Sequence, residues 1–269
     1  MLSIALAACG PADRRSDGPV RLGVTTTVQD SGLLDALVAD FERRSGRKVR
    51  ASVQGTGAVL SLARRGDVDV VLVHEPAQEL EFMRDGYGAQ RVLVMYNDFV
   101  LVGPPGDPAR VKGRTIVDAF RAIAESGATF ISRGDRSGTD VTEKSIWARV
   151  GLRTRPPWYV ESGVGQGQSL VVASERRGYM ITDRGTFVGR SATLDLVIVV
   201  EPLPRLPNVY HSITLDPTKV PAADRVAADS FVAYLLSPGG QQLIGGFGRD
   251  RFGTPLFIPA AGLAEGSLP

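Results

Sequence analysis

Hydrophobic and polar positions alternate along the chain with two periods, and these periods predict strands and helices in turn. Residues 20–24 are a short apolar strand, and residues 31–44 place their large apolar side chains at helical spacing, with Ser31 as the expected N-cap. The run at 69–74 is almost continuously apolar, which is typical of a parallel strand buried on both faces. Further strands are expected at 48–53, 99–103, 129–132, 179–182, 196–200 and 209–215, and further helices at 56–65, 115–125, 139–150, 168–175, 222–236 and 239–247.

This alternation predicts an α/β fold built from right-handed βαβ units with mostly parallel sheets. Strand-like segments near Asp98 and Val209 would let the chain cross twice between two lobes. We therefore expect residues 20–97 plus 209–269 to form lobe 1 and residues 98–208 to form lobe 2. Such an arrangement leaves a cleft between the lobes, where a small ligand can bind.

The composition argues against several classes of function and partner. The 31 basic and 29 acidic residues give a net charge of +2, and basic residues are interleaved with acids, so nucleic acid is not an expected partner. Two histidines and one cysteine provide neither a His/Cys metal cluster nor a disulfide framework. We expect no cofactor, no bound metal and a monomeric protein.

The single cysteine suggests export. Cys9 follows a short apolar run that ends in Leu6-Ala7-Ala8, and Gly10 comes directly after it. This pattern resembles the bacterial lipobox, in which the signal is removed before a cysteine that receives the lipid anchor. No basic residue precedes the apolar run, a defect that a start site placed too far downstream would explain. Residues 1–19 are thus expected to be a signal remnant and tether, and the protein to be lipid-anchored through Cys9 in the periplasm or at the cell surface.

Three loops rich in glycine, serine and threonine join expected strand ends to expected helix starts. They are Thr25-Thr26-Thr27, Gly55-Thr56-Gly57 and the segment 132–139. Helix N-termini offer free backbone N–H groups and a partial positive charge, and hydroxyls add further donors. Arg133 follows an apolar strand and offers a planar fork that matches two oxygens of a tetrahedral anion, whereas Arg136 is equally consistent with a surface charge. The three loops together predict an anion site.

Taken in order, these motifs resemble the tungstate-binding lipoproteins of tungstate ABC importers. The resemblance covers residues 21–257 and rests on Thr25-Thr26-Thr27, Ser31-Gly32-Leu33-Leu34, Gly55-Thr56-Gly57, the segment 66–74, Met95-Tyr96-Asn97-Asp98-Phe99, Ser132-Arg133-Gly134-Asp135, Ser137-Gly138-Thr139, the segment 158–163 and Thr182-Asp183-Arg184-Gly185-Thr186. It implies a periplasmic-binding-protein fold of type II that captures tungstate, or molybdate, for a membrane permease and its ATPase. The ligand-binding residues that it implies are Thr25, Thr26, Thr56, Arg133, Ser137, Gly138 and Thr139, with Gly165 as a further contributor from lobe 2.

Two positions depart from the family pattern. Val28 stands where a serine is expected, and Asp140 stands where a histidine is expected. An Asp140 carboxylate turned into the site would repel tungstate and could accept the proton of hydrogen phosphate, so phosphate and sulfate remain alternatives. A further alternative is a protein that senses oxyanions and has no role in transport. We expect no catalytic residue, because neither histidine has a nucleophile context, and no Gly-x-Ser-x-Gly elbow or phosphate-loop lysine is present.

Overall fold

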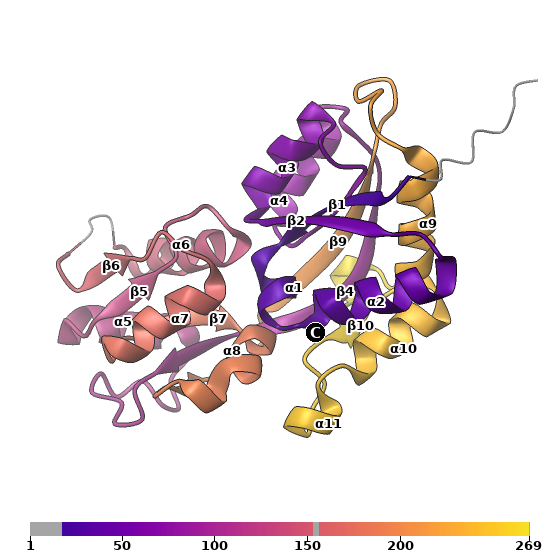
Figure 1. Cartoon of the computed structure of the whole chain (residues 1–269). Helices are drawn as coiled ribbons and strands as arrows, with labels where there is room; N and C mark the ends of the chain where they lie inside the picture. The colour runs from indigo at the N-terminus through magenta and orange to yellow at the C-terminus, as the bar shows by residue number, and fades with distance from the viewer. Residues whose placement is uncertain (1–17, 153–155, 269) are drawn as a thin grey trace, which may run out of the picture.

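The computed structural model describes residues 18–152 and 156–268, and the expected anchor residue Cys9 lies outside them. The chain forms two α/β lobes joined by two long strands (Figure 1). In the first lobe the strand order is β2-β1-β3-β9-β4-β10. These strands are β1 (Val20–Thr25), β2 (Val49–Gln54), β3 (Val70–Val73), β4 (Gly88–Gly103), β9 (Pro207–Leu215) and β10 (Ile258–Pro259).

Helices cover both faces of the first sheet (Figure 1). They are α2 (Leu33–Ser45), α9 (Arg225–Leu236) and α10 (Pro238–Gly246) on one face, and α3 (Thr56–Arg65) and α4 (Pro76–Arg84) on the other. The apolar strand β3 is buried on both sides as expected, because Val70 and Leu72 pack against the first group while Val71 and Val73 pack against the second. The short helices α1 (Thr26–Asp30) and α11 (Arg249–Phe252) and the 3-10 turn η2 (Glu265–Ser267) complete this lobe.

The second lobe is built in the same way around the far half of β4. Its strands are β5 (Phe130–Ser132), β6 (Tyr159–Glu161), β7 (Met180–Asp183) and β8 (Val197–Val200). Its helices are α5 (Ile116–Ser126), α6 (Gly138–Val150), α7 (Gln166–Glu175), α8 (Arg184–Arg190) and the 3-10 turn η1 (Ser191–Thr193). Phe120, Phe130 and Trp147 pack ring against ring on the α5/α6 side, with centroids 4.5–5.2 Å apart. Trp147 therefore serves packing.

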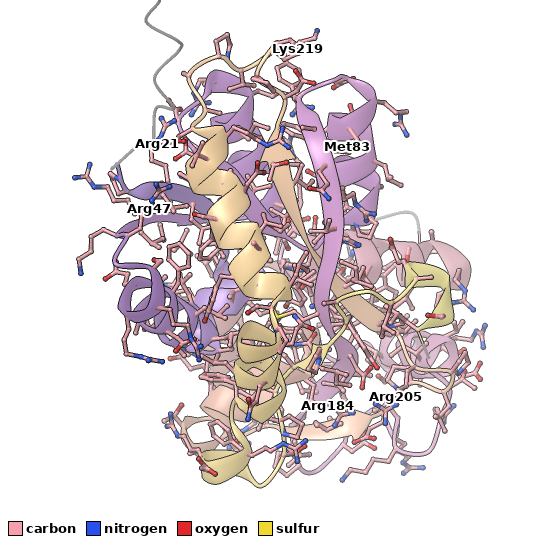
Figure 2. The ribbon with its side chains drawn as sticks, turned by 90° about the vertical axis from the view of Figure 1, so that its right-hand side faces the viewer. Arg21, Arg47, Met83, Arg184, Arg205 and Lys219 are labelled. Carbon is pink, nitrogen blue, oxygen red and sulfur yellow. The ribbon has the colours of Figure 1, made fainter. Side chains whose placement is uncertain are left out.

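Strands β4 and β9 connect the two lobes. The first part of β4 pairs with β9 as far as Asp98, and from Phe99 onward the same strand pairs with β7 and β8. The Asp98 carboxylate lies 2.8 Å from the Arg205 guanidinium and 4.0 Å from that of Arg184. Figure 2 shows these two arginines as neighbours at one end of the molecule, opposite Lys219. An ion cluster thus lies beside the crossover.

The structure differs from the sequence-based expectation in several local features. Pairs β1/β2, β1/β3 and β5/β6 are parallel as expected. The crossover strands add antiparallel pairs, so the large sheet is mixed, whereas β5 and β6 form a separate parallel pair. Ser31 ends α1, and Gly32 takes the N-cap position of α2 with a φ of 83°. The Ser31 hydroxyl still accepts a hydrogen bond from Leu33 N, the first N–H of α2, at 3.4 Å. Within the described ranges, no helix is long and apolar enough to cross a membrane.

Candidate functional site

Four helices begin where the two lobes face each other. Helices α1 and α3 follow the ends of β1 and β2 in lobe 1, and α6 and α7 follow the ends of β5 and β6 in lobe 2. Their N-cap residues, Thr25, Gly55, Ser137 and Gly165, all have extended backbones with ψ between 149° and 167°. The starts of α3 and α6 lie within one residue of the expected positions, and α7 begins two residues before the expected helix at 168–175. The short helix α1 was not expected, because the first helix was placed at 31–44.

Contacts between the four helix starts close them into one site. A Cβ built on Gly165 would lie 3.8 Å from Thr26 Cγ2, and one on Gly55 would lie 3.8 Å from Asp135 Oδ2. Gln166, on the first turn of α7, accepts a hydrogen bond from Arg133. These contacts bring Thr26 of lobe 1 next to Gly165 of lobe 2, and the start of α3 next to the loop that holds Arg133.

Backbone donors are available at this place. Thr25, Gly55 and Gly165 make no side-chain cap, so the first N–H groups of α1, α3 and α7 are not satisfied by their own N-cap side chains. The Ser137 hydroxyl instead accepts from Asp140 N at 3.4 Å, so this residue caps α6. Helices α3 and α7 have ten residues each and present the positive ends of their dipoles. Helix α1 has only five residues and contributes hydroxyl groups above all.

Within the first turns of α3, α6 and α7, three buried side-chain donors have no hydrogen-bond partner among the described residues. They are Thr56 Oγ1, Thr139 Oγ1 and Gln166 Nε2, and all three side chains belong to residues with 0% exposure. A buried polar atom without a partner costs about 1–3 kcal/mol, so such groups are rare unless a ligand satisfies them. Their gathering at the junction of the lobes indicates a binding site for a group rich in acceptors.

Arg133 lies at the centre of this site and is only 1% exposed. Its Nε donates to Val164 O at 2.9 Å, its Nη1 donates to Gln166 Oε1 at 2.6 Å, and its Nη2 contacts the Asp135 carboxylate. A guanidinium has five N–H donors, so these bonds fix its orientation and leave two donors for a ligand. Arg136, by contrast, is exposed and takes no part in these contacts.

Asp140 turns away from the site and into its own loop. Its Oδ1 accepts from Gly134 N at 2.9 Å, and its Oδ2 accepts from Arg136 N at 3.0 Å and from Lys144 Nζ at 2.7 Å. The Lys144 ammonium therefore balances the charge of this carboxylate. The two backbone hydrogen bonds of the carboxylate hold the loop that positions Arg133. Val28, the other departure from the family pattern, is fully buried in the first core and offers no donor.

His74 lies directly against the start of α6. A Cβ added to Gly138 would lie 2.9 Å from His74 Nδ1 and still closer to the His74 carbonyl oxygen, so only glycine allows this approach. Burial lowers the pKa of His74 to about 4, which keeps the ring neutral near pH 7. His74 is thus a packing residue at the lobe junction.

A groove of about 570 Å³ leads from the surface to this junction. Lobe 1 lines it with Gly57, Ala58, Ser61 and Gln78, and lobe 2 lines it with Gly134, Asp135 and Arg136. Gln78 Nε2 donates across it to Arg136 O at 3.0 Å. The site therefore lies between lobes that are in contact, with a path to solvent beside it.

Sequence reasoning missed several side chains at the site. Gln166 directly follows Gly165, which was an expected ligand-binding residue. Asp30 accepts a hydrogen bond from Gly167 N at 3.0 Å, and this bond joins the two lobes. Tyr210 Oη donates a hydrogen bond to Thr27 Oγ1 at 3.2 Å, although the two residues are far apart in the chain. The Gly-x-Gly spacing around Gln166 could have indicated a helix start that binds a ligand. The contact of Tyr210 depends on the order of the strands in the sheet, so no local sequence pattern could have indicated it.

Comparison with known proteins agrees with this geometry. A model of the PBP superfamily domain matches residues 13–238. The tungstate-binding protein TupA of Peptoclostridium acidaminophilum is 40% identical over 272 residues, which cover 97% of this chain and 95% of that protein.

Solved structures give the same result. The tungstate ABC transporter structure from Geobacter sulfurreducens is 42% identical, with a TM-score of 0.78 over 85% of this chain and 98% of that one. The tungstate-binding protein TupA from Desulfovibrio alaskensis G20 is 40% identical, with a TM-score of 0.76 over 91% of this chain and 99% of that one. The chain therefore belongs to the periplasmic-binding-protein superfamily, with the type II fold, and within it to the family of tungstate-binding proteins of ABC importers.

Proposed function

We propose that the protein captures tungstate, with molybdate as a close second ligand, and delivers it to an ABC permease and its ATPase. The observation that supports this most directly is the set of three unpartnered buried donors, Thr56, Thr139 and Gln166, around the Arg133 guanidinium. A fully deprotonated tetrahedral dianion can only accept hydrogen bonds, and it would satisfy all of these groups at once. The tungstate-binding relatives support the same ligand class.

The proposed binding residues are those that the sequence suggested, with one addition. Thr25, Thr26, Thr56, Arg133, Gly138 and Thr139 supply hydroxyl, guanidinium or backbone donors, and Gly165 supplies the start of α7. Ser137 acts through its backbone, because its hydroxyl is occupied as a cap. Gln166 joins the set through its amide nitrogen. This is a binding function, and we propose no catalytic step.

The orientation of Asp140 supports tungstate over hydrogen phosphate. A site for hydrogen phosphate needs an acceptor for the remaining proton, and the Asp140 carboxylate is already bound to Gly134, Arg136 and Lys144. Asp135 is likewise engaged, with Arg133 and with Ser137 N. Sulfate carries no proton, so the site would have to reject it through its shorter bonds and smaller size.

The test is a competition titration by calorimetry near neutral pH with tungstate, molybdate, sulfate and phosphate. We expect tungstate to bind most tightly, molybdate next, sulfate more weakly and phosphate most weakly. Phosphate binding more tightly than tungstate would overturn the assignment and direct mutagenesis to Asp135 and Asp140.

We further propose the lobe boundaries 20–97 plus 209–269 and 98–208. The apolar cores support them, since two of the clusters draw their residues from 20–95 and 210–257 and two others draw theirs from 99–200. We propose that the protein acts outside the cytoplasm as a monomer, held at the membrane only by a lipid on Cys9. The small-residue motif before Cys9 supports this anchor.

A further inference from the structure

Helix α6 carries a buried acid one turn behind Thr139, one of the proposed anion donors. Glu143 follows Thr139 by four residues, so the two side chains lie on the same face of the helix, about 6 Å apart along its axis. Thr139 has 0% exposure and Glu143 only 1%. An anion held at the start of α6 would therefore have the Glu143 carboxyl about 10 Å away in a region from which water is largely excluded.

Hydrogen bonds tie Glu143 to the strand end that positions Arg133. Glu143 Oε1 lies 2.6 Å from Tyr159 Oη on β6, and the same Tyr159 oxygen lies 3.0 Å from Ser132 Oγ at the end of β5. Ser132 directly precedes Arg133, and its Oγ lies 3.5 Å from Asp140 Oδ1. The carboxyl of Glu143 thus belongs to the layer of side chains directly beneath the anion loop.

The charged groups that face Glu143 lie on α6 and β6. Asp140 and Lys144 are its neighbours on α6, and Lys144 Nζ donates to Asp140 Oδ2 at 2.7 Å. The same ammonium lies 4.0 Å from the carboxylate of Glu161 on β6. Helix α5 and strand β7, which also pack on α6, contribute apolar side chains to the shared core. The positive charge of Lys144 is therefore directed to two other carboxylates.

These surroundings place the titration of Glu143 close to neutral pH. Burial raises the pKa of Glu143 to about 7, and the negative charge of Asp140 acts in the same direction. Hydrogen bonds with Ser132 and Tyr159 and the charge of Lys144 oppose this shift but do not cancel it. The carboxyl is therefore mostly protonated below about pH 7 and mostly ionised above it.

We propose that Glu143 couples tungstate binding to the uptake of a proton, so that the dianion binds best when Glu143 is protonated. The inference rests on the proposed function. An ionised carboxylate one turn behind Thr139 repels a dianion at the start of α6, whereas the neutral acid does not. By linkage, the bound dianion favours the protonated acid to the same extent, and the proton comes from the buffer. Glu143 thus sets the pH range of tight binding without touching the anion.

The test is calorimetry in buffers that differ in their ionisation enthalpy, which measures the protons taken up per bound tungstate. For the wild type we expect uptake of a fraction of one proton at about pH 7.5, and an affinity that falls up to about tenfold from about pH 6 to about pH 9. Glu143→Gln should take up no proton and should bind with the low-pH affinity at every pH. No uptake by the wild type, or the same uptake by Glu143→Gln, would overturn the proposal. A wild-type protein that binds no tungstate refutes the proposed function instead.

Two further variants separate this coupling from general damage. Tyr159→Phe removes a hydrogen bond that favours the ionised carboxylate, so the fall in affinity should move to higher pH. A purely structural defect would instead lower the affinity equally at every pH. Glu125→Gln, at an exposed position on α5, should keep the wild-type uptake. If Glu143→Gln does not fold, Tyr159→Phe decides the question, and an unshifted pH profile overturns the proposal.

Discussion

The backbone N–H of Gly167 donates a 3.0 Å hydrogen bond to the carboxylate of Asp30, and this bond joins the two lobes. Asp30 is the last residue of α1 in lobe 1, and Gly167 is on the first turn of α7 in lobe 2. A carboxylate at a helix N-terminus also interacts favourably with the helix dipole. The contact can form only when the lobes are closed.

Asp30→Ala should therefore weaken ligand retention. Loss of one charge-assisted bond of the closed state is expected to raise the tungstate dissociation rate about tenfold, with little change in the association rate. Stopped-flow fluorescence would measure both rates. Asp35→Ala removes an exposed carboxylate from the neighbouring helix and should change neither rate. A slower association rate with normal dissociation would contradict this role.

Gly138→Ala should hold the lobes apart. The added methyl group would overlap the carbonyl oxygen of His74 in the other lobe, so α6 could not approach the site. We expect a larger radius of gyration in the presence of tungstate, measured by small-angle scattering, and an affinity loss of at least about a hundredfold. Gly106→Ala, at a position with no atom within 4 Å, is the control. Normal closure of the Gly138 variant would show that the helix start can move aside.

Arg133→Ala should weaken tungstate binding by roughly 2–4 kcal/mol, because a buried, charge-assisted fork is lost and Asp135 is left without its partner. Arg133→Lys keeps the charge but cannot reproduce the bonds to Val164 and Gln166, so we expect it to recover only part of the loss. Arg149→Ala changes an exposed arginine on α6 and should be neutral. Calorimetry that finds equal affinities for Arg133→Ala and the wild type would remove this residue from the site.

Glu143 and His74 should contribute to the stability between about pH 5 and 6.5 with opposite signs. Burial raises the pKa of Glu143 to about 7, so this residue contributes stability at low pH that is lost as the pH rises toward that value. Burial lowers the pKa of His74 to about 4, so its contribution has the opposite sign: stability is present above its ordinary pKa and is lost as the pH falls. The contributions of Glu143 and His74 to the pH dependence should therefore offset each other in the wild type.

Glu143→Gln removes one of the two slopes. Compared with the wild type, the free energy of unfolding of this variant should gain a positive slope of up to about 1.4 kcal/mol per pH unit across this window, in urea titrations at several pH values. Glu125→Gln, at an exposed position on α5, should keep the wild-type profile. A parallel profile for Glu143→Gln would mean that Glu143 is already ionised in the folded protein.

Cys9 provides a prediction about location. If this cysteine is lipidated, the exported protein should partition into the detergent phase, and Cys9→Ala should move it to the soluble fraction. Both forms are expressed behind the same lipoprotein export signal, so that they are exported equally. Equal partition of both forms would refute the anchor.

Elements with strong local signals could be predicted from the sequence. The helix Thr56–Arg65 has the predicted bounds because Gly55 and Gly66 delimit it, and Gly66 takes a φ of 77° as a stop signal. The first part of β4 was missed because its polar residues, such as Gln90 and Arg91, interrupt the apolar pattern. Its polar face is satisfied by tertiary contacts, including the Arg91–Glu79 ion pair, which no local pattern reveals.

The residues of the candidate site likewise divide into those with a local sequence signal and those that depend on tertiary contacts. Thr56, Arg133 and Thr139 could be named because each stands at a strand end or helix start, where the chemistry is local. The orientation of Asp140 could not be predicted, since it depends on bonds to Gly134 and Arg136 within a folded loop. Tyr210 could not be named either, because only the sheet order brings it to Thr27.

The position of β9 in the first sheet has a consequence for the order of assembly. This strand lies between β3 and β4, so the first lobe lacks an inner strand until residues 207–215 are available. The helices α9 and α10, which cover one face of that sheet, come later still. The second lobe is complete by Val200 in β8. A chain that folds from its N-terminus must therefore finish the inserted lobe before the lobe that it started with.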